Sequence, residues 1–163
     1  MKAQKSSRAL TVSAMIAAMY VVLSYVASIL GLCSGVIQLR LSEALCVLPL
    51  FTPYAIPALT IGCLITNILF GGVIIDVIFG SVATLIGAVG TYLLRNTKHR
   101  ILALIPPILS NSLIIPPILS YAYGSEESML FMFITVMIGE ILSVIVLGWG
   151  LIKVLNKIKF IFK

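Results

Sequence analysis

Residues 128–154 read SMLFMFITVMIGEILSVIVLGWGLIKV, and this run is long and apolar enough to cross a membrane. A transmembrane helix needs about 20 consecutive, mostly apolar residues. The run contains one acid, Glu140, near its middle, and no basic residue before Lys153. A charge at that depth in a bilayer costs about 3 kcal/mol on insertion scales. The pattern therefore predicts a membrane helix and marks Glu140 as a candidate functional residue.

The rest of the chain has the same apolar character. Hydrophobic residues make up 61% of the 163 residues, and the mean hydropathy is +1.20. A soluble domain of this size could not cover so much apolar surface, whereas a bilayer can. The length allows about six spans of ~20 residues with short loops. We therefore expect one membrane domain over residues 1–163, without a separate soluble domain.

The basic residues indicate which way this domain faces. Lys and Arg favour the cytoplasmic side of a membrane, which also explains the net charge of +6 without a nucleic-acid partner. With the N-terminus inside, an even number of crossings returns each basic cluster to the same side. We therefore predict six helices with both termini cytoplasmic. The clusters are Lys2, Lys5 and Arg8; Arg95, Lys98 and Arg100; and Lys153, Lys157, Lys159 and Lys163.

The expected fold is an all-α integral membrane protein. The first apolar run is long enough to span, so we interpret it as an uncleaved helix and not as a signal peptide.

The fifth run contains Pro106-Pro107 and Pro116-Pro117. Because each proline removes a backbone donor, we expect irregular backbone there, of the kind that membranes tolerate beside a cavity. The six predicted helices cover residues 9–30, 41–52, 57–71, 74–94, 101–121 and 128–154.

Several polar residues fall in the outer half of this topology. Carboxylates and carboxamides gathered in one half of a small bundle predict a polar pocket open to the outside. Simpler interpretations remain for some of them, since Arg40 and Glu43 have the spacing of an i,i+3 ion pair and Asp76 could cap a helix. The asparagines could instead form hydrogen bonds between helices. The candidates are Glu43, Asp76, Asn67, Asn111 and Glu140.

Other features bear on partners and cofactors. Ala14 and Ala18 are small residues at i,i+4, a spacing that lets another helix approach closely. The chain has no phosphate-binding loop, so active uptake would need energy from another protein. The single histidine, His99, lies in a loop, and the three cysteines have no Cys-x-x-Cys spacing. We therefore expect neither a metal site nor a cofactor.

Three stretches of the middle of the chain resemble the QueT family, the substrate-binding S components of energy-coupling factor (ECF) transporters. They are IQLRLSEALCVLP (residues 37–49), LTIGCLITN (residues 59–67) and DVIFGSVATL (residues 76–85). The resemblance covers essentially the whole chain. It implies a multi-pass protein of the plasma membrane, with six helices and an outward-facing site for a queuosine precursor, a 7-deazaguanine base.

The resemblance also implies partners. An S component has no ATPase of its own and couples to a transmembrane T component and two cytoplasmic ATPases. Ala14 and Ala18 match the small-residue motif by which S components dock on the T component. The loops at residues 31–40 and 71–76 would gate the site.

The candidate residues suit a 7-deazaguanine chemically. Its ring N–H and exocyclic amine are adjacent donors that one carboxylate can accept together, and an aminomethyl group adds an ammonium that favours a second carboxylate. We expect Glu140 or Glu43 to bind the guanine-like edge and Asp76 to bind the ammonium. The candidate set also includes Asn67, Asn111, Gln38 and Arg40, with Phe70, Phe79, Tyr121 and Tyr123 as aromatic residues for stacking.

Two alternatives remain at this point. The same architecture could bind another ring vitamin, such as riboflavin or thiamine, for which a carboxylate that recognises guanine would be needless. An intramembrane enzyme could use Glu140 and Asp76 as acid and base, although no nucleophile or metal set has recognisable spacing. Whether the ligand is the aminomethyl base, the cyano base or queuine also stays open.

Overall fold

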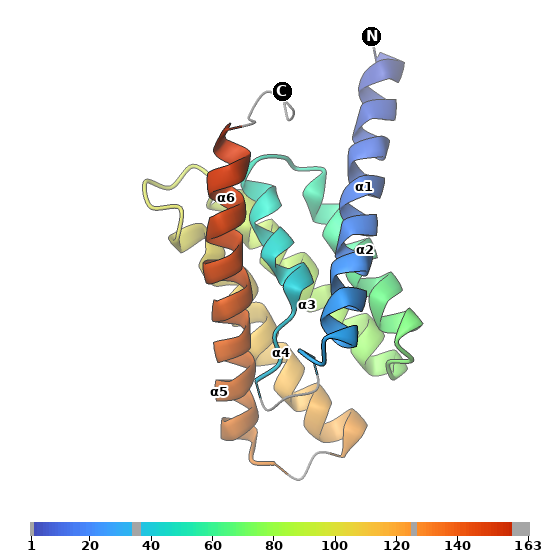
Figure 1. Cartoon of the computed structure of the whole chain (residues 1–163), viewed down its shortest axis with the longest axis vertical. Helices are drawn as coiled ribbons and strands as arrows, with labels where there is room; N and C mark the ends of the chain where they lie inside the picture. The colour runs from blue at the N-terminus through green and yellow to red at the C-terminus, as the bar shows by residue number, and fades with distance from the viewer. Residues whose placement is uncertain (1, 34–36, 125–126, 158–163) are drawn as a thin grey trace.

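The computed structural model describes residues 2–33, 37–124 and 127–157 (Figure 1). The expected all-α fold is confirmed, because the described residues form helices joined by turns and loops, without a strand. The elements are α1 (Lys2–Ile29), η1 (Leu41–Leu50), α2 (Ala55–Leu69), α3 (Ile74–Leu93), η2 (Leu102–Leu104), α4 (Ile105–Tyr123), α5 (Met129–Glu140), η3 (Ile141–Leu147) and α6 (Gly148–Lys157).

Four helical stretches are long and apolar enough to cross a membrane: Ser7–Ile29, Ile74–Leu93, Leu102–Ala122 and Met129–Lys157. The predicted second and third spans are shorter. The 3-10 helix η1 has 10 residues and α2 has 15, so each is roughly 20 Å long against a hydrocarbon core of about 30 Å. The count of six spans and their orientation stay predictions.

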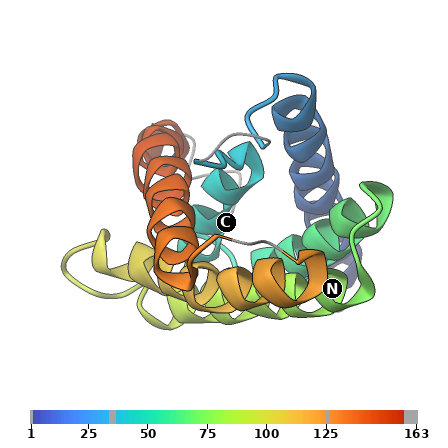
Figure 2. The same ribbon diagram turned by 90° about the horizontal axis from the view of Figure 1, so that it is seen from below.

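The helices form an arc around η1. Successive elements pack on one another, α1 on α2, α2 on α3, α3 on α4 and α4 on α5, and η1 contacts α1, α3, η3 and α6. Figure 2 shows η1 between α1 on one side and the continuous rod of α5, η3 and α6 on the other. Apolar side chains of η1, among them Leu45, Val47 and Leu48, are therefore buried at the centre of the bundle.

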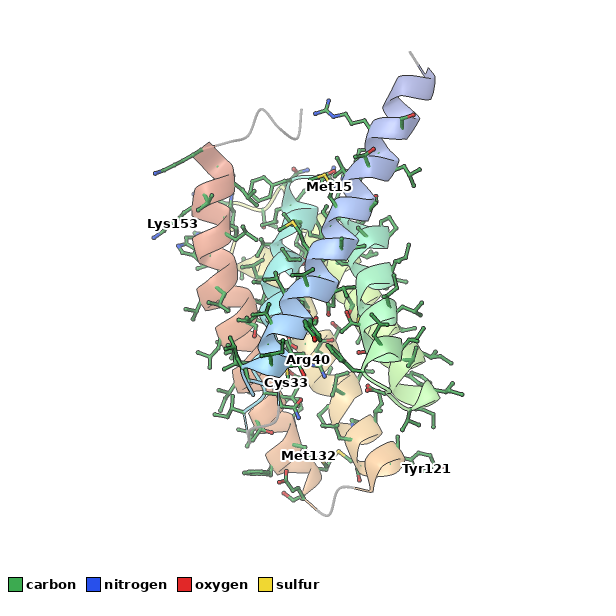
Figure 3. The ribbon with its side chains drawn as sticks, turned by 45° about the vertical axis from the view of Figure 1, so that its right-hand side comes forward. Met15, Cys33, Arg40, Tyr121, Met132 and Lys153 are labelled. Atoms are coloured by element: carbon green, nitrogen blue, oxygen red, sulfur yellow. The ribbon has the colours of Figure 1, made fainter. Side chains whose placement is uncertain are left out.

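The start of α1 and the end of α6 lie at the same end of the bundle, and the turn between α4 and α5 lies at the opposite end (Figure 1). Figure 3 places Lys153 toward the first end and Tyr121 and Met132 toward the second, with Arg40 and Cys33 between them. The described basic segments at the two ends of the chain thus lie at the same end of the bundle.

The expectation of irregular backbone is wrong for the first proline pair, and neither pair interrupts α4, which runs as one helix from Ile105 to Tyr123. Pro106 and Pro107 occupy its first turn, where the N–H groups have no helical partner in any case. Only Pro116 and Pro117 lie inside the helix. The first pair packs closely on α3, since a Cβ added at Gly87 would lie 2.6 Å from Pro107 Cα.

Candidate ligand-binding site

A cavity of about 220 Å³ lies within the bundle, between α1, the segment before η1, and the junction of α2 and α3. It is smaller than the roughly 300–1,000 Å³ of pockets for drug-sized ligands, so it suits a small molecule. Its lining is part polar and part apolar. The lining residues are Tyr20, Ser24, Ala27, Cys33, Gln38, Arg40, Ser42, Thr66, Asn67, Phe70, Asp76 and Leu119.

One polar wall comes from the tight junction between α2 and α3. Gly71 has a φ of 70°, the left-handed conformation that ends many helices, and the Gly72 N–H donates to Asn67 O at 2.9 Å. This turn brings Asn67 beside Asp76, so that Asn67 Nδ2 donates to the Asp76 carbonyl at 3.5 Å. Both predicted site residues line the cavity.

The second polar wall is the segment that precedes η1. Arg40 has extended backbone, with φ −98° and ψ 96°. Because alternate residues of an extended segment point to the same side, Gln38 and Arg40 can both face the cavity, and both line it. The Arg40 N–H donates to Ser143 Oγ at 3.2 Å, which ties this segment to the rod of α5, η3 and α6.

Glu43 lies behind this wall and does not line the cavity. Its side chain is fully buried. Tyr20 donates to Glu43 Oε1 at 2.5 Å and Cys46 donates to Oε2 at 3.0 Å. Arg40 lies within electrostatic range of both Glu43 and Glu140. Arg40 thus lines the cavity and also lies near two buried carboxylates.

Glu140 and Asn111 are also buried outside the cavity lining, at 4% and 2% exposure. The Asn111 side chain lies beside Glu140. Among the described residues, however, neither Glu140 Oε2 nor Asn111 Nδ2 has a hydrogen-bond partner. The structure therefore brings Asp76, Asn67, Gln38 and Arg40 together around the cavity, and places Glu43, Glu140 and Asn111 behind them.

The aromatic candidates also divide into residues that line the cavity and residues that do not. Phe70 lines the cavity and stacks on Tyr25, with ring centroids 6.4 Å apart and an interplanar angle of 5°. Phe79 and Tyr121 are 51% and 85% exposed and do not line it. The side chain of Tyr123 lies outside the part of the chain that the structure describes.

The contribution of α1 to the cavity was not predicted from the sequence. Tyr20, Ser24 and Ala27 repeat at i, i+4 and i+7, a spacing that puts them on one face of a helix, and they line the cavity. Tyr20 and Ser24, polar residues four positions apart in an apolar run, were the available signal. Thr66, next to Asn67, and Cys33 were also overlooked.

Outside the cavity, Ala14 and Ala18 are exposed on α1. They border a shallow apolar groove of about 420 Å³ between α1 and α2.

Glu127 is exposed in the loop after α4, and Glu126 lies outside the described residues. The residues that the structure describes contain no group of three or more His, Cys, Asp or Glu able to hold a metal ion.

The chain was compared with known proteins. Residues 10–157 match the family model described as QueT transporter. The queuosine precursor transporter QueT of Lactococcus lactis subsp. cremoris (strain MG1363) is 38% identical over 86 residues, which are 53% of this chain and 50% of that protein. The match thus spans about half the length of this curated relative. No solved structure matches the chain.

Proposed function

Since this chain belongs to the QueT transporter family, we propose that it binds a queuosine precursor as the S component of an ECF transporter. The family is one of transporters and not of enzymes. Together with the four long apolar helices, it identifies a multi-pass protein of the cell membrane. The name of the Lactococcus relative supports a queuosine precursor as the ligand.

The observation that carries the proposal is the pairing of two polar walls in one small cavity. Asp76 and Asn67 lie on one wall, and Gln38 and Arg40 on the other. A 7-deazaguanine presents donors at its ring N–H and exocyclic amine and an acceptor at its ring carbonyl. Arginine donates only, and a carboxylate accepts only, so the two walls can bind opposite ends of such a base.

In this arrangement Asp76 binds the ammonium of an aminomethyl base, which makes 7-aminomethyl-7-deazaguanine the favoured ligand. Among the described carboxylates, Asp76 is the one that lines the cavity. Asn67, Gln38 and Arg40 then contact the ring, and Phe70 offers an apolar face to it. Direct contact of Glu140 or Glu43 with the guanine-like edge stays a prediction, since neither residue lines the cavity.

The size of the cavity favours a deazaguanine over larger vitamins. A volume of about 220 Å³ suits one bicyclic base, whereas riboflavin adds a third ring and a ribityl chain. Riboflavin is therefore the informative negative ligand.

The remaining parts of the proposal concern the assembly. We propose six spans with both termini cytoplasmic, because the described basic segments of α1 and α6 lie at one end of the bundle (Figure 1). Energy comes from two cytoplasmic ATPases through a transmembrane T component. Ala14 and Ala18 support docking on that component, since both are exposed beside an apolar groove.

Calorimetric binding to the detergent-purified chain tests the proposal. The ligands are 7-aminomethyl-7-deazaguanine, 7-cyano-7-deazaguanine and riboflavin, and the variants are Glu140→Gln and the control Glu127→Gln, an exposed loop glutamate. We expect a deazaguanine to bind, riboflavin not to bind, and Glu140→Gln but not Glu127→Gln to weaken binding. Folded protein that binds riboflavin and no deazaguanine would contradict the assignment.

A further inference from the structure

The rod of α5, η3 and α6 contacts the cavity wall at Gly139. A Cβ added there would collide with the carbonyl oxygen of Gln38. The obstacle is backbone, which cannot rotate aside as a flexible side chain can. Glycine at this position therefore lets the segment that carries Gln38 and Arg40 lie directly against the rod.

A second contact lies one turn further along the rod. Ser143 is fully buried, and its hydroxyl accepts the Arg40 N–H at 3.2 Å. Because Gln38 and Arg40 both line the cavity, Gly139 and Ser143 support the backbone of two lining residues without lining the cavity themselves. On the other side of the segment, the Leu39 N–H donates to Leu32 O at 2.9 Å, which ties it to the end of α1.

The π-helical segment η3 explains how the rod presents one continuous supporting face. A third close contact occurs at Gly148, where an added Cβ would lie 2.6 Å from Val47 Cγ1 of η1. In a regular α-helix each residue turns about 100°, so Gly148, nine residues after Gly139, would point to roughly the opposite side. The i→i+5 pattern of η3 turns less per residue and brings these contacts toward one face.

We propose that Gly139 and Ser143 are positioning residues that set the affinity and selectivity of the cavity through Gln38 and Arg40. They do not line the cavity, and as residues i and i+4 they lie on the same face of the rod, toward the segment they support. Glu140, which lies between them in the sequence, is within electrostatic range of Arg40. The identity of the ligand in this inference rests on the proposed function, whereas the support of the Gln38–Arg40 segment does not.

The test compares two variants with matched controls in the full chain. Gly139→Ala is paired with Gly150→Ala, because an added Cβ at Gly150 meets nothing within 4 Å. Ser143→Ala is paired with Ser112→Ala, since Ser112 is equally buried and its hydroxyl has no partner among the described residues. For each protein we would measure the Kd for 7-aminomethyl-7-deazaguanine, the melting temperature and, without ligand, the rate of Cys33 alkylation by N-ethylmaleimide.

Cys33 reports the geometry of the segment independently of any ligand. It is half-buried, lines the cavity, and contacts Leu39 O through its Sγ at 3.9 Å. Cys46 and Cys63 are buried, and mass spectrometry separates the three sites. A shift of the Gln38–Arg40 segment should therefore change the alkylation rate at Cys33.

We expect Gly139→Ala to raise the Kd about tenfold or more and to change the Cys33 rate several-fold. Loss of the Ser143 hydrogen bond should raise the Kd by about 3–10-fold. The controls should match the wild type. Lower melting temperatures with unchanged Kd and Cys33 rate would overturn the proposal, because they would indicate a structural role only.

Two outcomes separate this inference from the proposed function. If the wild type binds no deazaguanine, the proposed function fails, and the Cys33 rate still decides whether Gly139 and Ser143 position the segment. If Gly139→Ala does not fold, Ser143→Ala decides, since it removes one oxygen atom and adds no volume. An unchanged Cys33 rate in Ser143→Ala would then overturn the proposal.

Discussion

Removing the hydroxyl of Tyr20 should destabilise the fold by a measurable amount. Tyr20 is 2% exposed and donates to Glu43 Oε1 at 2.5 Å, joining α1 to η1. In Tyr20→Phe, the fully buried Glu43 side chain keeps Cys46 as its hydrogen-bond donor among the described residues. A thiol is a weak donor. Hydrogen bonds to charged groups contribute about 1.5–3 kcal/mol in soluble proteins. Side-chain hydrogen bonds between membrane helices average about 0.6 kcal/mol, with a maximum near 1.7 kcal/mol.

The complete burial of Glu43 favours the upper end of the membrane range. We therefore expect Tyr20→Phe to lower the free energy of unfolding by about 1.5 kcal/mol, or the melting temperature by roughly 3–6 °C for a chain of this size. Unfolding in mixed micelles with increasing SDS measures the free energy. Tyr25→Phe is the control, because Tyr25 lies on the same helix and is 58% exposed.

A double-mutant cycle with Glu43→Gln identifies the source of the effect. If the hydrogen bond to the carboxylate is responsible, Tyr20→Phe should lower the free energy of unfolding by less in the Glu43→Gln background than in the wild type. An equal loss of unfolding free energy in both backgrounds, or no loss in either, would refute the reasoning.

Three further predictions concern the cavity and the docking face. Asp76→Asn should weaken binding of 7-aminomethyl-7-deazaguanine by roughly 10–100-fold and affect the cyano base much less, because only the former carries an ammonium; equal losses for both ligands would contradict this role. Gly80→Ala places a Cβ 3.0 Å from Asn67 Nδ2 and should raise the Kd about tenfold, whereas an unchanged Kd would show that this wall tolerates the methyl group. Ala14→Leu should abolish copurification with the T component and ATPases while leaving ligand binding unchanged, and copurification at the wild-type level would exclude this docking face.

Much of the fold could be predicted from local sequence. The apolar runs are long, and the breaks between them carry clear signals, such as Gly71-Gly72 and Gly124, both of which end helices in the structure. Asp76 and Asn67 were also accessible, because each is a polar residue at the end of an apolar run. The proline pairs misled the prediction because their effect depends on position within the helix, and Pro106 and Pro107 fall in its first turn.

The arrangement of the site depends on contacts between residues far apart in the sequence. Tyr20 meets Glu43 across 23 positions, and Arg40 meets Ser143 across 103. No local pattern indicates that Tyr20 and Cys46 form hydrogen bonds to Glu43, or that Glu140 is buried outside the cavity lining. The π-helical segment η3, which turns Gly148 toward Val47 of η1, is likewise not predicted by a regular helical period.

Ligand protection of Cys33 tests the central claim most directly, because this thiol lines the cavity while Cys46 and Cys63 are buried. The purified chain would be alkylated with N-ethylmaleimide in the presence and absence of saturating 7-aminomethyl-7-deazaguanine, and the modification of each cysteine followed by mass spectrometry. We predict that the ligand slows modification of Cys33 at least about tenfold, as expected for a bound molecule that fills a small pocket. Binding demonstrated by calorimetry together with an unchanged Cys33 rate would place the ligand elsewhere and contradict the account.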